Sequence, residues 1–150
     1  MGLWNYLQAF FYFYAMIKKI FIPTLLFLAA CHNSHSYKKA EDAQDAGREF
    51  IRASLDGDYD KANFFMYRDS TNQMLLDKWK LDYDKMDHEQ RKKYMDADIR
   101  VINIQNINDS VTSYTYTNTY KKDTTTIRVI HVSGDWLVDL KAILKDKMDF

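Results

Sequence analysis

The setting of Cys31, the single cysteine of the chain, indicates a specific modification. Lys18 and Lys19 precede an apolar run over Ile20–Leu28, and two alanines separate that run from the cysteine. A charged start, a short apolar run and small residues at its end are typical of a secretory signal. The run is also shorter than the ~20 residues that a membrane-spanning helix needs. We therefore predict a signal peptide over residues 1–30, followed by lipid attachment at Cys31.

The residues Leu28-Ala29-Ala30-Cys31 resemble the lipobox of bacterial lipoproteins. The resemblance implies that the cysteine thiol is diacylated, that the chain is cut before Cys31 and that the new amino group can also be acylated. Two or three acyl chains, such as palmitate, anchor a protein stably where one does not. The implied location is the bacterial cell envelope, on the outer membrane and on its periplasmic or surface side.

Residues 1–15 fit a signal peptide poorly, because they place an aromatic block ahead of the lysines. We predict that the biological start is Met16 and that the preceding residues come from an upstream start. The alternative is an uncleaved membrane helix over roughly residues 3–30. That helix would carry Lys18 and Lys19 near its middle, at a cost of about 2.5–3.5 kcal/mol each. The lipoprotein signal is therefore favoured.

A second group with chemical potential comprises Tyr114, Tyr116, His131 and Trp136. Brought together, they could line a pocket in which tyrosine hydroxyls donate hydrogen bonds and the histidine titrates. The alternative, which we favour, is that they are amphipathic side chains packed in a core with their polar atoms bonded locally.

No other residues suggest a catalytic or metal site. His32 and His35 have no third ligand nearby, so no metal and no cofactor are predicted. The carboxylates of Asp82, Asp84 and Glu89 are expected to be solvated positions on helices.

Length and charge narrow the remaining possibilities. The 150 residues suffice for one domain. The net charge is 0, and removing residues 1–30 takes away two lysines and no acid, which leaves −2. Phosphate binding needs a surplus of basic residues, so nucleic acid is not an expected partner. A single cysteine excludes an internal disulfide.

The periodicity after the signal predicts helices first. Residues 31–39 are polar and read as a tether, and the domain is expected over residues 40–143 with a charged tail over 144–150. Helices are predicted over 40–55, 59–67 and 72–83, with a further charged helix that starts at Asp87. Gly57 supplies a left-handed end for the first helix, and Asp58, Asp69 and Asp87 are candidate caps, the last with Gln90 in a capping box.

At Ile99 the apolar period changes from 3.6 to 2. Strands are predicted over 99–107, 111–120, 124–133 and 136–143, which form an antiparallel meander. The fold class is therefore α+β, with N-terminal helices packed on a curved four-stranded antiparallel sheet, because these helices are the available cover for one sheet face.

Two expected turns set the register of the sheet. A turn at Gly134-Asp135 would place His131 opposite Val138, and a turn at Lys122-Asp123 would place Tyr114 opposite His131. The tyrosines, His131 and Trp136 would then share the face under the helices. The opposite face would carry the apolar side chains Ile130, Val132 and Leu137.

Two stretches resemble small bacterial lipoprotein domains of unknown function. Phe50–Ala62 resembles their opening, a helix followed by Gly-Asp-Tyr-x-Lys-Ala and a second helix, and Ser133–Leu140 resembles their closing hairpin. These domains have the cystatin-like cone fold that nuclear transport factor two and ketosteroid isomerase share. The resemblance implies helices on a curved sheet, a pocket at the open end and, often, a dimer. The isomerases need an acid beside a tyrosine, and here only the tyrosines can be matched.

Three functional hypotheses follow. The first is a lipid-anchored envelope protein whose non-catalytic domain binds a small apolar ligand or another envelope protein. The second is an isomerase-like or cyclase-like enzyme that uses His131 with Tyr114 or Tyr116. The third is a structural homodimerisation module with an apolar outer sheet face. Because a fold does not determine an activity, the arrangement of side chains has to separate them.

Overall fold

The computed structural model describes residues 36–146, and from Tyr37 onward these belong to one compact unit. Cys31 and the predicted signal peptide lie outside the described residues. Four helices come first: α2 (Ala43–Asp56), α3 (Tyr59–Phe64), α4 (Ser70–Asp84) and α5 (His88–Met95). Four strands and a short helix follow: β1 (Ile99–Asn108), β2 (Val111–Asn118), β3 (Thr125–Val132), β4 (Asp135–Asp139) and α6 (Ala142–Asp146).

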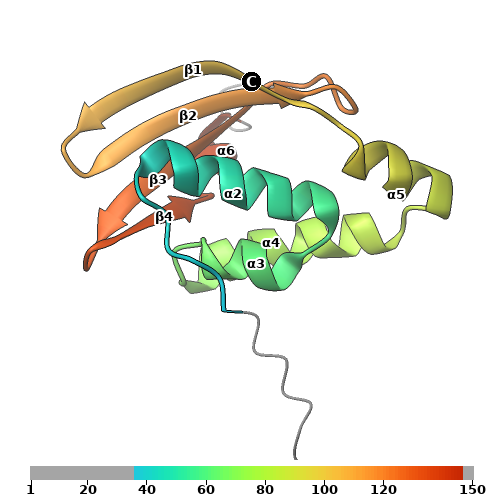
Figure 1. The fold of residues 1–150 in the computed structure, drawn as a ribbon, viewed down its shortest axis with the longest axis horizontal. Helices are drawn as coiled ribbons and strands as arrows, with labels where there is room; N and C mark the ends of the chain where they lie inside the picture. The colour runs from blue at the N-terminus through green and yellow to red at the C-terminus, as the bar shows by residue number, and fades with distance from the viewer. Residues whose placement is uncertain (1–35, 147–150) are drawn as a thin grey trace, which may run out of the picture. The chain divides into compact units, whose positions relative to one another are not determined.

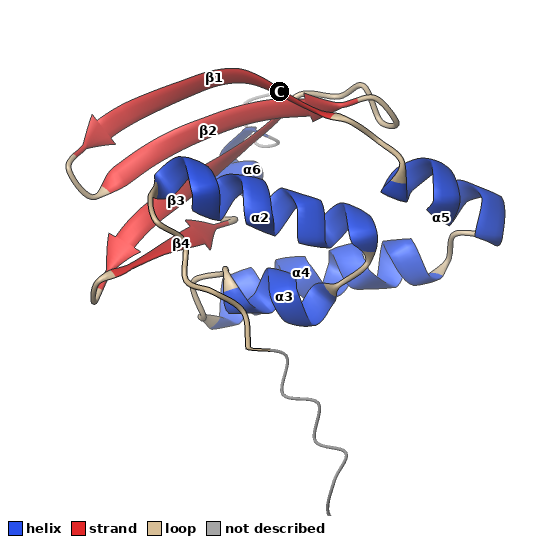
Figure 2. Ribbon diagram, viewed as in Figure 1, coloured by secondary structure: helices blue, strands red, loops and turns tan. Residues whose placement is uncertain are grey.

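The strands form one antiparallel sheet in the order β1-β2-β3-β4, and the sheet is curved (Figure 1). Figure 2 shows α2, α3 and α4 gathered on one side of the strands, with α2 lying against the sheet. The α+β arrangement predicted from the sequence is therefore confirmed. None of the helices in residues 36–146 is long and apolar enough to cross a membrane.

The helix boundaries follow from side-chain caps. The Asp42 carboxylate accepts a hydrogen bond from the Asp45 backbone N–H, which starts α2 at Ala43 instead of the predicted residue 40. Asp58 and Asp69 cap α3 and α4 as predicted, and Asp87 forms the predicted capping box with Gln90.

The core lies between α2 and the sheet. Alternate residues of β2 are buried, with Tyr114 and Tyr116 pointing to the helices. Gly47 on α2 lets the helix approach the Tyr114 ring closely, since a Cβ at this position would lie 3.0 Å from the ring. Phe50 of α2 and Ile127 of β3 are fully buried beside them. This packing explains why the helix-facing side of the sheet carries the tyrosines.

Two predicted elements were too long. The helix predicted over 59–67 ends at Phe64, because the next residues extend and pair in parallel with β4, where Tyr67 N–H donates to the Val138 carbonyl at 2.9 Å. The strand predicted over 136–143 ends at Asp139. Beyond it the Leu140 N–H donates to the Asn72 side chain, and α6 begins within the range where strand and tail were expected.

Both predicted turns were wrong in register. The β3–β4 turn is Ser133-Gly134, with φ values of 53° and 86°, so His131 lies opposite Trp136 instead of Val138. Positive φ at both turn positions is the type I′ geometry that matches strand twist. The β2–β3 connection is longer than two residues, and Tyr114 pairs with Ile127. Each shift is an even number of residues, so the predicted faces survive although the predicted neighbours do not.

Candidate functional site

A hollow of about 360 Å³ opens where the helices diverge from the end of the sheet. Its apolar and aromatic wall comes from α2, α4, α5, β2 and α6 through the residues Ile51, Leu55, Trp79, Tyr94, Tyr116 and Ile143. Its polar rim comes from β2, the β2–β3 loop and the start of β3 through Asn118, Lys121, Asp123, Thr124, Thr125 and Thr126. The hollow therefore offers apolar surface beside a comparable share of polar groups, and such a combination can orient a small molecule.

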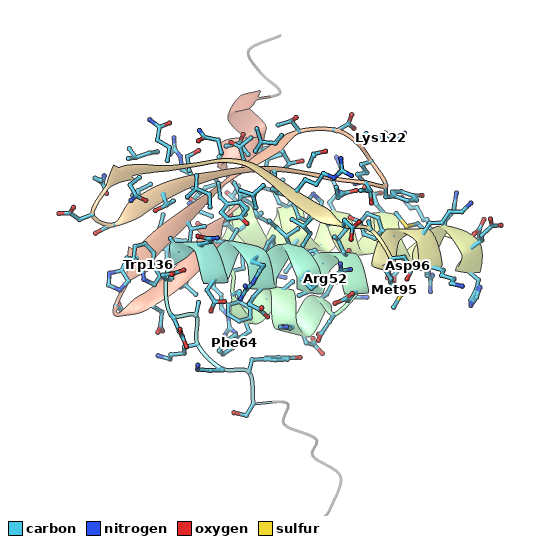
Figure 3. All side chains as sticks on the ribbon, turned by 45° about the horizontal axis from the view of Figure 1, so that its top comes forward. Arg52, Phe64, Met95, Asp96, Lys122 and Trp136 are labelled. Carbon is cyan, nitrogen blue, oxygen red and sulfur yellow. The ribbon has the colours of Figure 1, made fainter. Side chains whose placement is uncertain are left out.

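Hydrogen bonds from Arg52 hold α5 in position, so that Tyr94 reaches the wall of the hollow. The guanidinium of Arg52 on α2 donates to the backbone carbonyls of Met95 at 2.7 Å and Ala97 at 3.0 Å. Figure 3 labels Arg52 and Met95 at this junction. Tyr94 also packs edge-on against Tyr120, with ring centroids 5.3 Å apart. The α5 side of the wall is therefore fixed by contacts from two directions.

The tyrosines of the wall are neutral hydrogen-bond donors. Burial raises the pKa of Tyr116, and the nearby Tyr94 and Tyr114 add to this effect against a hydrogen bond with Thr125. Burial also raises the pKa of Tyr94, with Tyr120 and Tyr83 contributing and Arg52 opposing. Both hydroxyls therefore stay protonated at neutral pH, where they can donate a hydrogen bond but cannot accept a proton from a substrate as a base.

Two further polar groups of the hollow, those of Ser54 and Lys121, interact with neighbouring groups of the protein. The Ser54 hydroxyl donates to the Phe50 carbonyl at 2.9 Å, one turn earlier in α2, so it is not available as a nucleophile. The Lys121 ammonium lies over the Tyr94 ring, 5.7 Å from its centroid. Among the described residues no group of three or more histidine, cysteine, aspartate or glutamate side chains could hold a metal ion.

The four residues predicted to share a pocket lie in different places. Tyr116 lines the hollow, whereas Tyr114 is buried against Gly47 and lines none of the hollows described here. The His131 ring is exposed and stacks on Trp136, with centroids 4.6 Å apart. Within the described residues no carboxylate bonds to that ring. The sequence therefore located one wall residue of the hollow and placed His131 on the correct face but at the wrong end.

The contribution of Trp79 and Tyr94 to the wall of the hollow was not predicted from the sequence. Both are large aromatic residues of predicted helices, where the helical period predicts contact with the core, and both do contact it. What the pattern could not express is that α4 and α5 bring these two side chains to the end of β2, where they line a hollow together with Tyr116. The available signal for a shared site was the presence of bulky aromatic residues on two separate predicted helices and of tyrosines on a predicted strand.

The chain matches no model of a known protein family, and no curated protein is significantly similar to it. The side chains of the hollow are therefore the basis for a functional proposal.

Proposed function

We propose that this chain is a lipid-anchored cell-envelope protein whose α+β domain binds a small apolar ligand. The observation that carries the proposal is the hollow of about 360 Å³, with an aromatic wall formed by Trp79, Tyr94 and Tyr116. Burying apolar ligand surface there is favourable by roughly 25 cal/mol per Å². The protonated tyrosine hydroxyls and the rim threonines would orient a hydroxyl or carbonyl group on that ligand.

The wall chemistry favours binding over proton-transfer catalysis. An isomerase-like reaction needs a group whose pKa lies near the working pH. The pKa shifts of Tyr94 and Tyr116 go upward, away from neutrality. His131, the histidine on which the enzyme hypothesis depends, belongs to a different part of the sheet. These placements support a binding domain, because the histidine and the tyrosine that the enzyme hypothesis pairs do not share the hollow.

A phenylalanine at position 125 is expected to fill the hollow. Thr125 lies opposite Tyr116 on the helix-facing side of β3, and aromatic residues suit strands. We expect Thr125→Phe to weaken binding of the neutral apolar dye N-phenylnaphthylamine at least about tenfold. Dye fluorescence titrated against protein concentration measures this.

Ser113→Phe is the matched control for this experiment. Ser113 lies on β2, on the outer face, opposite Arg128 of β3, and it does not line the hollow. Its dye affinity should equal that of the unmodified protein. Equal loss in both variants, or no loss in Thr125→Phe, would remove the support for this binding site.

Lipid anchoring at Cys31 is tested separately. The proposal predicts that the membrane fraction contains a protein that begins at Cys31 and carries two or three acyl chains, and that Cys31→Ser abolishes both changes. Intact-mass measurement of the purified membrane protein reads out the start and the acyl groups together. A mass that includes residues 1–30 without acyl groups would contradict the anchor.

A homodimerisation module is a second candidate function, and the exposed edge of β1 favours it. Val101, Ile102 and Ile107 are 46%, 56% and 52% exposed on this strand. The opposite edge of the sheet is closed, because Met66 bridges to Val138 on β4. Two copies would therefore pair β1 to β1 around a two-fold axis. By contrast, the outer-face residues Ile130, Val132 and Leu137 are half-buried.

Self-pairing of β1 makes a specific prediction. With Ile104 on the two-fold axis, Val101 falls opposite Ile107, and Arg100, the single charge of the strand, falls opposite Asn108. Ile102→Lys should then give a monomer. Leu81→Lys, at a position 59% exposed on α4, is the control and should leave the dimer intact. Light scattering after size exclusion gives the mass of each variant. A monomeric unmodified protein would exclude this candidate.

A further inference from the structure

A second hollow lies at the other end of β2, and it shares no lining residue with the first. It has a volume of about 600 Å³ and is enclosed by three segments that are far apart in the sequence. These are the start of α2, the β1–β2 hairpin and Trp136 at the beginning of β4. Figure 3 labels Trp136 at the hairpin end of the sheet, where these segments meet. The residues that supply its chemistry are Asp42, Gln44, Asn106, Asn108, Asp109 and Trp136.

The indole of Trp136 is a fixed aromatic wall of this hollow. Trp136 lies opposite His131 in the hairpin, and the two rings stack with an interplanar angle of 30°. The adjacent Asp135 is paired with Lys39 at 2.7 Å, which holds the start of β4 against the segment before α2. Trp136 is half-buried, and among the described residues its indole N–H has no hydrogen-bond partner. It can therefore offer both an apolar surface and a donor to a ligand.

Two asparagines, Asn106 and Asn108, line the same space. The Thr112 hydroxyl donates to Asn106 Oδ1 at 3.0 Å, and the Ser110 N–H donates to Asn108 Oδ1 at 2.9 Å. These bonds occupy the carbonyl oxygens and leave the NH₂ groups as donors. Within the described residues, neither NH₂ group has a partner.

Acceptors line the same hollow, from the start of α2 and from the hairpin turn itself. Asp42 uses one carboxylate oxygen to cap α2, which leaves the second oxygen available. Asp109 and the Gln44 amide bond to none of the described groups. The lining contains two carboxylates and no basic side chain, so an anionic ligand would be repelled.

We propose that this hollow binds a neutral saccharide. A sugar ring has an apolar C–H face that suits the half-buried indole of Trp136, and hydroxyl groups that both donate and accept. The amides of Asn106 and Asn108 would donate to these hydroxyls, and the carboxylates of Asp42 and Asp109 would accept from them. An organic cation would also be attracted by carboxylates and an indole. However, an organic cation would leave the amide donors unused, and the Asp42 carboxylate already accepts a hydrogen bond at the start of α2.

The test uses the full-length protein in detergent micelles and saturation-transfer NMR at millimolar concentrations of each probe. The probes are the neutral disaccharides cellobiose and diacetylchitobiose, with choline as the cationic probe and glucose 6-phosphate as the anionic one. We expect transfer to at least one neutral disaccharide and none to the anion. Transfer to choline alone, or to none of the probes, would overturn the proposal.

Two asparagine variants on β1 locate the binding. Asn106→Ala removes one donor from the hollow and should weaken disaccharide binding at least about tenfold. Asn103→Ala makes the same substitution on the same strand, at an exposed residue that pairs with Thr115 on the outer face, and should leave the affinity unchanged. Equal affinities in the two variants would overturn the proposed location. Thr125→Phe should not affect disaccharide binding, so this site and the apolar hollow succeed or fail independently.

Discussion

Replacing Asn72 by alanine is expected to lower the free energy of unfolding by about 2–4 kcal/mol. Asn72 is fully buried at the start of α4, and its side chain connects three parts of the fold. Its Oδ1 accepts from the Leu140 N–H at 2.8 Å, and its NH₂ group donates to the Tyr67 carbonyl at 2.9 Å. Alanine would leave the buried Leu140 N–H unpaired, at about 1–3 kcal/mol, would remove the bond to the partly buried Tyr67 carbonyl and would open a small cavity.

The adjacent Gln73 supplies the control for this prediction. Gln73 is exposed and bonds only to Asp77 on the next turn, so Gln73→Ala should change stability by less than about 0.5 kcal/mol. Urea unfolding followed by circular dichroism measures both variants on the same scale. An Asn72→Ala midpoint equal to that of Gln73→Ala would mean that water replaces the lost bonds and that the junction is not buried in solution.

The junction at Asn72 also explains which parts of the fold the sequence could predict. Local sequence signals were sufficient where a capping residue or the hydrophobic period determines the structure. Examples are the capping box of Asp87 and Gln90 and the alternating burial of β2. The end of α3 and the end of β4 depend instead on one another, through Tyr67 and Val138. Such a pairing between distant residues leaves no periodic trace in either segment. The predicted helix and strand therefore both ran past their true ends.

The candidate site followed the same division. The alternation of β2 correctly placed Tyr114 and Tyr116 under the helices, since a register error of an even number of residues keeps the face. Alternation does not determine which residue lies opposite on the neighbouring strand. His131 was therefore predicted beside the tyrosines, whereas in the structure it stacks with Trp136. The apolar hollow depends on where α4 and α5 end in space. Its wall residues Trp79 and Tyr94 could therefore be predicted as apolar anchors only.

Gly57→Ala is expected to destabilise the fold by about 2–4 kcal/mol, through two separate effects. Gly57 ends α2 at φ 75°, where a Cβ costs about 1–2 kcal/mol. That Cβ would also lie 2.5–2.7 Å from the Tyr83 ring. The ring cannot move aside easily, because it packs edge-on against Tyr59 at 5.9 Å and in a tilted arrangement against Tyr94 at 6.0 Å. Relieving the overlap therefore costs further packing energy.

Gly134→Ala separates the two effects. Gly134 has a similar φ of 86°, but a Cβ there would meet nothing within 4 Å. This variant should lose only the backbone contribution of about 1–2 kcal/mol. The difference between the two midpoints in urea then measures the contact with Tyr83. Equal losses in the two variants would show that the Tyr83 ring yields freely.

The displaced ring also connects this substitution to the proposed binding site. Tyr83 packs on Tyr94, and Tyr94 is part of the wall of the apolar hollow. If Tyr83 shifts to admit a methyl group at position 57, Tyr94 must adjust, because close-packed interiors transmit small displacements. Gly57→Ala should therefore weaken binding of the apolar dye under conditions where the variant remains folded, whereas Gly134→Ala should not. A Gly57→Ala protein with lower stability and unchanged dye affinity would place the adjustment on the Tyr59 side of the ring, away from the hollow.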